Sequence, residues 1–242
     1  EWWKARALMP DHQRAYDLIA ERVSKEAETV IDLGCGTGEL LRRLYQANPN
    51  RVIIGTDNSK YTVEILQKNL NSEGIEFKSV QPHELKVQRQ GVSILVDDLL
   101  KSNIPSNIAD IVLLVFPEQF GEYQVTRNDE DELERFARYI GTTTKRINDP
   151  LRVLKAIKAS QLASRITKTG GLYLFARYDI SIPGSNFTMI ARKTMEKQHA
   201  FFDLELKDMR FVESVEVHED VKEYVPKEGE RRGWRIWTFR KR

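Results

Sequence analysis

Three glycines at alternate positions, Gly34, Gly36 and Gly38, follow a short apolar run, and an acid, Asp32, stands just before them. Glycine lets a turn bend sharply and approach a ligand closely, because it has no Cβ. The spacing differs from the Gly-x-Gly-x-x-Gly of dinucleotide-binding turns and from the Gly-Lys-Ser/Thr ending of a phosphate-binding loop. A carboxylate at Asp32 would repel a pyrophosphate. The pattern therefore predicts a ligand that carries positive charge and no phosphate.

The glycine turn joins a predicted strand to a predicted helix. Val30, Ile31 and Leu33 are typical of a short buried strand, and apolar residues recur at helical spacing over 40–45. A strand, a glycine turn and a helix in succession form the first βα unit of a nucleotide-binding α/β fold.

The segment from Val30 to Gly38, Val-Ile-Asp-Leu-Gly-Cys-Gly-Thr-Gly, resembles the first motif of class I S-adenosylmethionine-dependent methyltransferases at every defining position. S-adenosylmethionine carries a sulfonium and an ammonium but no phosphate, in agreement with the charge of Asp32. The resemblance covers residues 29–178 by motifs and the rest by topology. It implies a methyltransferase with S-adenosylmethionine as cofactor and S-adenosylhomocysteine as product.

The second predicted strand, over 51–57, ends in an acid about twenty residues after the glycine turn. The carboxylate of Asp57 can accept hydrogen bonds from both ribose hydroxyls, which is the role an acid has in dinucleotide-binding folds. Asp57 also matches the ribose-binding acid of the family. Asn58, beside it, is predicted to contact the cofactor as well.

A third predicted strand, over 91–100, ends in paired acids, Asp97 and Asp98. In the family, an acid at this place binds the adenine amino group and the next backbone amide meets the ring, which implies these roles for Asp98 and Leu99. Asp97 stands where the family has a small residue, so either acid could bind the adenine. The alternative is that both acids only cap the following helix.

The most apolar run, over 108–117, is typical of a central parallel strand covered on both faces. Ligands of open α/β sheets bind at the carboxyl ends of the strands. Val115, Phe116 and Glu118 are therefore predicted to lie near the reacting methyl group. Glu118 is the candidate catalytic residue, as a general base or as a group that holds a cationic substrate; the alternative is a solvated side chain.

The full set of predicted cofactor contacts is Asp32, Gly34, Cys35, Gly36, Gly38, Asp57, Asn58, Asp98, Leu99, Val115 and Phe116. Cys35 is interpreted as a small residue in a tight turn rather than as a nucleophile, since the sequence indicates no base beside it. The four histidines and the single cysteine have no metal-ligand spacing, so no metal is predicted. Methyl transfer from a sulfonium requires alignment above all, and no fixed catalytic residue.

The predicted fold is α/β: a mostly parallel, seven-stranded twisted sheet with helices on both faces and a C-terminal antiparallel hairpin over 211–221 and 234–240. Residues 1–28 are predicted to form an N-terminal helical cap, and residues 29–242 a Rossmann-like methyltransferase domain. The domain carries an insert at about 118–149, whose amphipathic helix over 129–140 is a candidate lid. Residues 74–91 have no clear pattern.

The composition is that of an ordinary globular chain. Of 242 residues, 40% are hydrophobic and 31% charged, and the formal net charge is +2, so the charge neither demands nor excludes nucleic acid. No apolar run is long enough to span a membrane. The single cysteine fits a reducing compartment, which predicts a cytoplasmic protein.

The resemblance leaves the substrate open. Candidate lids at the N-terminus and after the fourth strand favour an enclosed pocket and a small molecule with an O, N or C nucleophile, methylated by in-line displacement. One alternative is an RNA or protein methyltransferase, since residues 116–120 faintly resemble a segment of the tRNA guanine-N7 methyltransferases. Another is a non-catalytic subunit that binds S-adenosylmethionine. The aromatic side chains available to line a pocket are Trp2, Trp3, Tyr61, Phe116, Phe120, Tyr123 and Tyr178.

Overall fold

The computed structural model describes residues 10–23, 26–86, 89–115, 124–139, 141, 143–146, 150–181, 208–218 and 231–242. Of the helices described, none is long and apolar enough to cross a membrane. In chain order, the elements are α2 (Pro10–Arg22), β1 (Thr29–Leu33), α3 (Glu39–Ala47), β2 (Val52–Asp57), α4 (Lys60–Ser72), β3 (Phe77–Ser79), the 3₁₀ turn η1 (Pro82–Lys86), β4 (Gly91–Val96), β5 (Ala109–Val115), α5 (Arg127–Tyr139), η2 (Thr144–Arg146), α6 (Pro150–Ile166), β6 (Thr167–Ser181), β7 (Met209–His218) and β8 (Arg231–Lys241).

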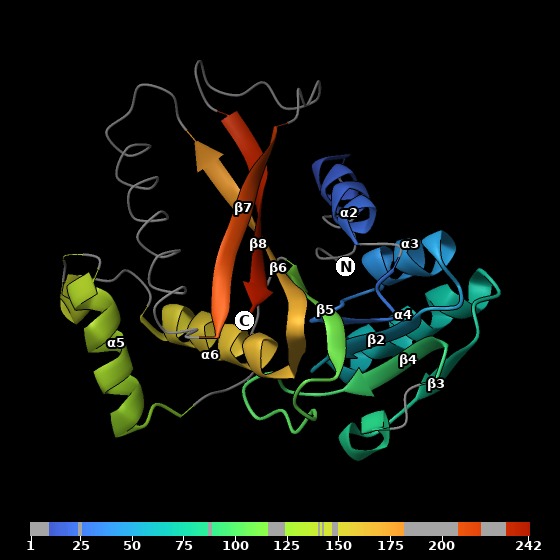
Figure 1. Ribbon diagram of the computed structural model, residues 1–242, viewed down its shortest axis with the longest axis horizontal. Coiled ribbons are helices and arrows are strands. Elements are labelled where there is room, and N and C mark those ends of the chain that lie inside the picture. Colours follow the sequence, from blue (N-terminus) through green and yellow to red (C-terminus); the bar gives the residue numbers. More distant parts are fainter. Residues whose placement is uncertain are drawn as a thin grey trace.

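The strands form one sheet in the order β3-β4-β2-β1-β5-β6-β8-β7 (Figure 1). Neighbouring strands from β3 to β6 are parallel, whereas β8 is antiparallel to both β6 and β7. This confirms the predicted mostly parallel sheet with an antiparallel hairpin at its end. The sheet has eight strands, one more than predicted. The additional strand, β3, contains only three residues, too few for an alternating pattern to identify.

Apolar side chains alternate between two cores, one on each face of the sheet. Ile53 of β2 belongs to the core that α2, α3 and α4 cover, and its neighbour Ile54 belongs to the core that α6 covers. Val30 and Ile31 divide in the same way on β1. Strands that are buried on both faces have near-continuous apolar sequences, as these do. Figure 1 shows the helices on the two sides of the sheet.

The antiparallel pair of β6 and β8 is longer than the parallel part of the sheet. β6 pairs with β5 as far as Ala176, but its pairing with β8 continues to Ser181 opposite Arg231. The two strands therefore extend beyond the end of β5, and Figure 1 shows them rising past it. They do so at the carboxyl end of β6, because β5 and β6 are parallel.

The amphipathic helix predicted over 129–140 is α5, and it packs on α6. Its N-terminus is capped, because the Asp129 carboxylate accepts bonds from both the backbone N–H and the hydroxyl of Thr126, at 2.8 and 2.7 Å. The ammonium of Lys158 on α6 lies 3.0 Å from Asp129 and 2.7 Å from Glu132, both of which are buried. A half-buried cation thus joins the two helices through two buried carboxylates.

We expect Lys158→Ala to lower the free energy of unfolding by about 2 kcal/mol, because it leaves two buried carboxylates without their cation. Arg138→Ala is the matched control, since Arg138 pairs with Glu134 at 3.9 Å with both side chains exposed. Its effect should stay within about 0.5 kcal/mol. Urea unfolding of the three proteins measures both values. Equal losses in the two variants would contradict the role of Lys158 in neutralising the two buried carboxylates.

Candidate functional site

The carboxyl ends of the parallel strands bring most of the described predicted residues to one edge of the sheet. β1 lies at the centre of the parallel part, with β2 on one side and β5 on the other. The chain passes from β1 to β2 on one side and reaches β5 on the other only after β4, so the strand order reverses at β1. A ligand in an open α/β sheet binds at such a point. The glycine turn follows β1 directly and therefore lies there.

The three glycines of the turn all have backbone conformations that glycine favours. The φ angles are 74° at Gly34, 56° at Gly36 and 89° at Gly38. A Cβ at Gly34 or Gly36 would have no atom within 4 Å, so these two residues are needed for their conformation and border open space. A Cβ at Gly38 would lie 2.2 Å from Leu66 Cδ1. Gly38 is therefore also needed for the close approach of the turn to Leu66 of α4.

Asp57 connects the end of β2 to the glycine turn. Its Oδ2 accepts a hydrogen bond from Gly36 N at 3.1 Å, and its Oδ1 accepts one from Ser59 N at 2.9 Å. Burial raises the pKa of the Asp57 carboxyl, while these two hydrogen bonds lower it. Each carboxylate oxygen can accept a further hydrogen bond. Asp57 can therefore hold the turn and accept ribose hydroxyls at once, beside the exposed Asn58.

Asp32 is a buried acid whose carboxyl group has a strongly raised pKa. Its side chain belongs to β1, and the residue is 2% exposed. Burial, and after it the negative charge of Asp57, raises the pKa of Asp32 to about 7. A cationic ligand group beside Asp32 would favour the ionised carboxylate, which fits the charge predicted for the ligand.

Cys35 lies within the turn, where its backbone N–H donates to Thr56 O at 2.8 Å. Burial, and then the charges of Asp32 and Asp57, raises the pKa of the Cys35 thiol well above its usual range. The thiolate is the nucleophilic form of cysteine. The environment therefore disfavours nucleophilic chemistry at this position.

The paired acids after β4 have different environments. Asp98 caps the following turn, because its Oδ1 accepts a hydrogen bond from Leu100 N at 3.0 Å. Its Oδ2 lies 4.0 Å from the exposed ammonium of Lys101. Asp97 extends the pairing with β2 through its N–H to Asp57 O, at 3.0 Å. Its Oδ2 is buried without a hydrogen-bond partner in the described part of the chain, and burial raises the pKa of its carboxyl.

Two further residues predicted to contact the cofactor differ in their exposure. Val115 is buried at the end of β5, and Leu99 is half-buried in the turn after β4. Phe116 and Glu118 lie outside the described residues. Among the aromatic residues predicted to line a pocket, Tyr61 has a described side chain, which is 66% exposed near the start of α4.

Sequence reasoning missed the role of Ser59. Its backbone N–H holds the Asp57 carboxylate, and its hydroxyl caps α4 by accepting a hydrogen bond from Thr62 N at 3.2 Å. A serine directly before a helical pattern is the signal that could have identified this cap.

The comparisons with known proteins agree with this geometry. A family described as "Methyltransferase domain" matches residues 24–225. A carboxy-S-adenosyl-L-methionine synthase from Actinobacillus succinogenes is 36% identical over 108 residues, which cover 44% of this chain and 39% of the relative. The chain spans less than half the length of the curated relatives that it matches.

Two solved structures show the same fold over almost the whole chain. The YcgJ protein from Bacillus subtilis is similar with a TM-score of 0.57 at 13% identity, covering 96% of this chain and 99% of that one. Geranyl diphosphate methyltransferase in complex with S-adenosylmethionine also has a TM-score of 0.57, at 9% identity, covering 96% and 86%. Identities this low support a shared fold and nothing finer.

We expect Gly38→Ala to be more destabilising than Gly36→Ala. Each substitution imposes a left-handed conformation on alanine, at about 1–2 kcal/mol. Gly38→Ala also forces a Cβ against Leu66, which adds about 1–3 kcal/mol of overpacking. Urea unfolding compares the two variants, and equal midpoints would contradict the packing role of Gly38.

The raised pKa of Asp32 predicts a pH-dependent difference in stability between the protein and Asp32→Asn. Between pH 3.8 and about 7, the folded protein retains a proton on Asp32 that the unfolded chain releases. The contribution of Asp32 to stability is therefore greatest below pH 3.8 and is lost as pH rises to about 7. Across this range, the stability of wild type should fall relative to that of Asp32→Asn, as measured by urea unfolding. Parallel curves would disprove the shift.

Proposed function

The chain belongs to the class I S-adenosylmethionine-dependent methyltransferases, and we propose that it transfers the methyl group of this cofactor to an O, N or C nucleophile of a small molecule. The observation that carries the proposal is the hydrogen bond from Gly36 N to the Asp57 carboxylate, which joins the glycine turn to the end of β2. The bond holds the Asp57 carboxylate, which would accept the ribose hydroxyls, beside a turn that borders open space.

The residues at the sheet edge suit the different parts of the cofactor. Asp57 would accept the ribose hydroxyls, and Asp98 and the N–H of Leu99 would bind adenine. Asp98 is preferred over Asp97, because its Oδ2 faces the exposed Lys101 while the Oδ2 of Asp97 is buried. The glycine turn and the negative charge of Asp32 would receive the cationic methionine part.

S-adenosylmethionine, when bound, supplies a methyl group on a sulfonium, and displacement of that methyl by a nucleophile releases a neutral thioether. The chain's own task is to hold the nucleophile in line with the methyl and to exclude water. Glu118 follows the carboxyl end of β5 in the chain and is proposed to accept a proton from the nucleophile or to hold a cationic substrate.

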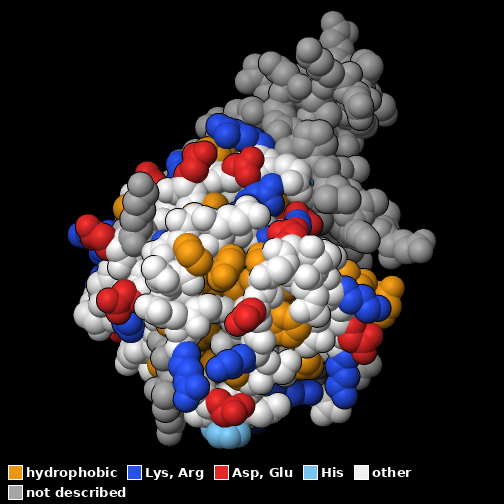
Figure 2. Space-filling view, turned by 90° about the vertical axis from the view of Figure 1, so that its right-hand side faces the viewer, with side chains coloured by type: hydrophobic (Ala, Val, Ile, Leu, Met, Phe, Trp, Pro, Cys, Tyr) orange, Lys and Arg blue, Asp and Glu red, His pale blue; other side chains and the backbone are white. Residues whose placement is uncertain are grey.

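A small substrate is proposed over a nucleic acid because the candidate lids favour an enclosed pocket, and the charge, which excludes neither substrate, shows no strong basic excess. The formal net charge is only +2. On the face shown in Figure 2, acidic and basic side chains are interspersed, and hydrophobic side chains gather between them. Binding to a nucleic acid backbone favours a basic patch or stripe instead. The name of geranyl diphosphate methyltransferase gives one example of a small-molecule substrate on this fold.

A second candidate function is chemistry on the cofactor itself. Two of the curated relatives are named carboxy-S-adenosyl-L-methionine synthase, and one of them shares 36% identity over 108 residues. Such an enzyme would replace a proton of the cofactor's methyl group with a carboxyl group taken from a second, carboxyl-donating substrate, instead of methylating an acceptor. Mass spectrometry of the nucleoside products distinguishes the two reactions, since methyl transfer yields S-adenosylhomocysteine.

We expect Asp57→Asn to weaken the binding of S-adenosylmethionine about tenfold or more. Hydrogen bonds to a charged acceptor contribute about 1.5–3 kcal/mol, roughly twice as much as those to a neutral acceptor, and about 1.4 kcal/mol is a tenfold change in affinity. Isothermal titration calorimetry with S-adenosylmethionine and S-adenosylhomocysteine measures the change. The amide has one acceptor oxygen, which can keep the bond from Gly36 N, while its NH₂ group replaces the oxygen that accepts from Ser59 N, so this variant also loses one backbone hydrogen bond.

Asp110→Asn is the matched control for Asp57→Asn. The Asp110 carboxylate also accepts two backbone bonds, from Glu28 N at 3.1 Å and Thr29 N at 2.8 Å, but at the amino end of the strands. Its substitution should cost stability while the affinity for the cofactor stays within about twofold. Failure of the unaltered protein to bind either ligand would refute the proposed function. Salt-dependent binding of RNA would favour the nucleic acid alternative.

A further inference from the structure

Helix α2 precedes the methyltransferase domain in sequence and packs against it. The helix ends at Arg22, and the family match begins at residue 24. Ala15 and Ile19 of α2 are fully buried in the same core as the apolar residues of α3. The helix also contacts the C-terminal strands β7 and β8. α2 is therefore fixed by apolar burial against the first helix after the glycine turn.

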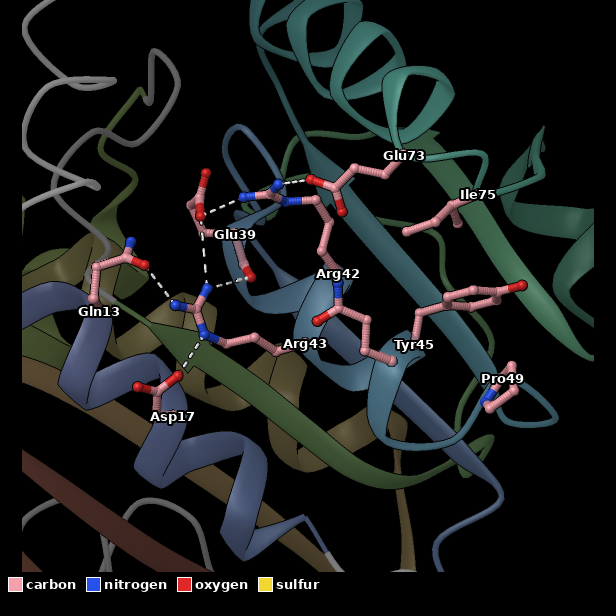
Figure 3. A pocket seen from close by; sticks show the side chains of 10 residues that line it. Gln13, Asp17, Glu39, Arg42, Arg43, Tyr45, Pro49, Glu73 and Ile75 are labelled. Atoms are coloured by element: carbon pink, nitrogen blue, oxygen red, sulfur yellow. Dashed lines mark hydrogen bonds and ion pairs between the residues drawn. The ribbon is translucent and has the colours of Figure 1, made fainter.

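The guanidinium group of Arg43 makes several polar contacts between α2 and α3. Arg43 of α3 donates from Nε to Asp17 Oδ1 at 2.7 Å and from Nη2 to Gln13 Oε1 at 2.5 Å. Its guanidinium carbon also lies 5.6 Å from the centre of the Tyr16 ring, within cation–π range. Figure 3 shows the guanidinium group pointing from α3 toward α2, between Asp17 and Gln13.

The same guanidinium group holds the first residue after the glycine turn. Arg43 Nη1 donates to Glu39 O at 3.0 Å and lies 3.6 Å from Glu39 Oε2. Glu39 follows Gly38 directly, is buried, and forms the start of α3. Arg43 thus contacts α2 on one side and, on the other, Glu39, the first residue of α3, which follows the glycine turn directly.

Arg42 provides a natural comparison, because it shares Glu39 but does not make these contacts with α2. Its Nη2 donates to Glu39 Oε2 at 2.5 Å, and its Nη1 donates to Glu73 at the end of α4. Both arginines line a pocket of about 770 Å³ with Asp17, Glu39 and Glu73. Because each guanidinium group is already paired with a carboxylate, we interpret the arginines as connecting the elements around the pocket rather than forming an anion site.

We propose that Arg43 is a positioning residue that couples the docking of α2 to the glycine turn, so that a docked α2 tightens cofactor binding. The proposal rests on the proposed function, since it concerns the same cofactor site. Coupling between two equilibria is reciprocal, so cofactor binding must strengthen the docking of α2 by the same factor. Ligand binding also stabilises the fold as a whole, so the coupling is recognised by slower exchange in α2 beyond the slowing in the parallel strands.

The test combines calorimetry with hydrogen–deuterium exchange on the full chain, using S-adenosylhomocysteine as the ligand. In the wild type, saturating ligand should slow the exchange of α2 amides as well as those of the glycine turn. Arg43→Ala should weaken ligand binding about tenfold, within the usual range of such couplings, and should lose the ligand-induced slowing in α2 at saturation. Arg42→Ala removes an equal charge from Glu39, and it should weaken binding less than threefold and retain the slowing in α2.

Arg43→Lys provides a second variant in case Arg43→Ala does not fold, as judged by circular dichroism. A single ammonium cannot reach Asp17, Gln13 and Glu39 O together, so this variant should also lose the slowing in α2. Equal affinities in the Arg42 and Arg43 variants, with α2 exchange unaffected by ligand in the wild type, would overturn the inference and leave the proposed function intact. Absence of ligand binding in the wild type would instead refute the proposed function, and the inference with it.

Discussion

The parallel pairing of β1 with both β2 and β5 is the constraint on which the site depends. Parallel strands require crossovers that return over the faces of the sheet, so helices cover both faces and apolar side chains occupy them. Ile53 and Ile54 illustrate the result, since each belongs to a different core. Charged groups near these strands are therefore displaced to the strand ends. Asp57 and Asp98, the acids proposed to bind the cofactor, lie at this carboxyl edge.

The concentration of acids at this edge has an energetic cost. Asp32 and Asp57 each have a raised pKa, and the charge of one acts on the other. No cation among the described residues pairs with either carboxylate. Burial and repulsion disfavour the ionised carboxylates, so a positively charged ligand group would stabilise them and relieve the repulsion. Such strain at a binding site is expected where function and stability compete.

The parts of the fold that the sequence could predict are those encoded by local patterns. The glycine turn, the ends of β1 and β2 and the insert helix α5 follow from spacing and periodicity over a few residues. The three residues of β3 are too few for such a pattern, and β4 ends at Val96, so that Asp97 and Asp98 belong to the turn. The contacts of Arg43 join residues up to thirty positions apart. Tertiary packing brings these residues together, and no local sequence pattern encodes that packing.

The position of β8 determines the order in which the chain can complete its fold during synthesis. β8 lies between β6 and β7 in the sheet, although it follows both in sequence. Among the described strands, β7 has no other partner, and α2 at the opposite end of the chain also contacts β8. β7 cannot reach its final place on a ribosome-bound chain until residues 231–241 have emerged, and α2 lacks its contact with β8 until then. The strands from β1 to β5 can pair much earlier. Until β8 is made, the nascent chain would therefore expose apolar surface of an incomplete sheet, and chaperones bind such surface.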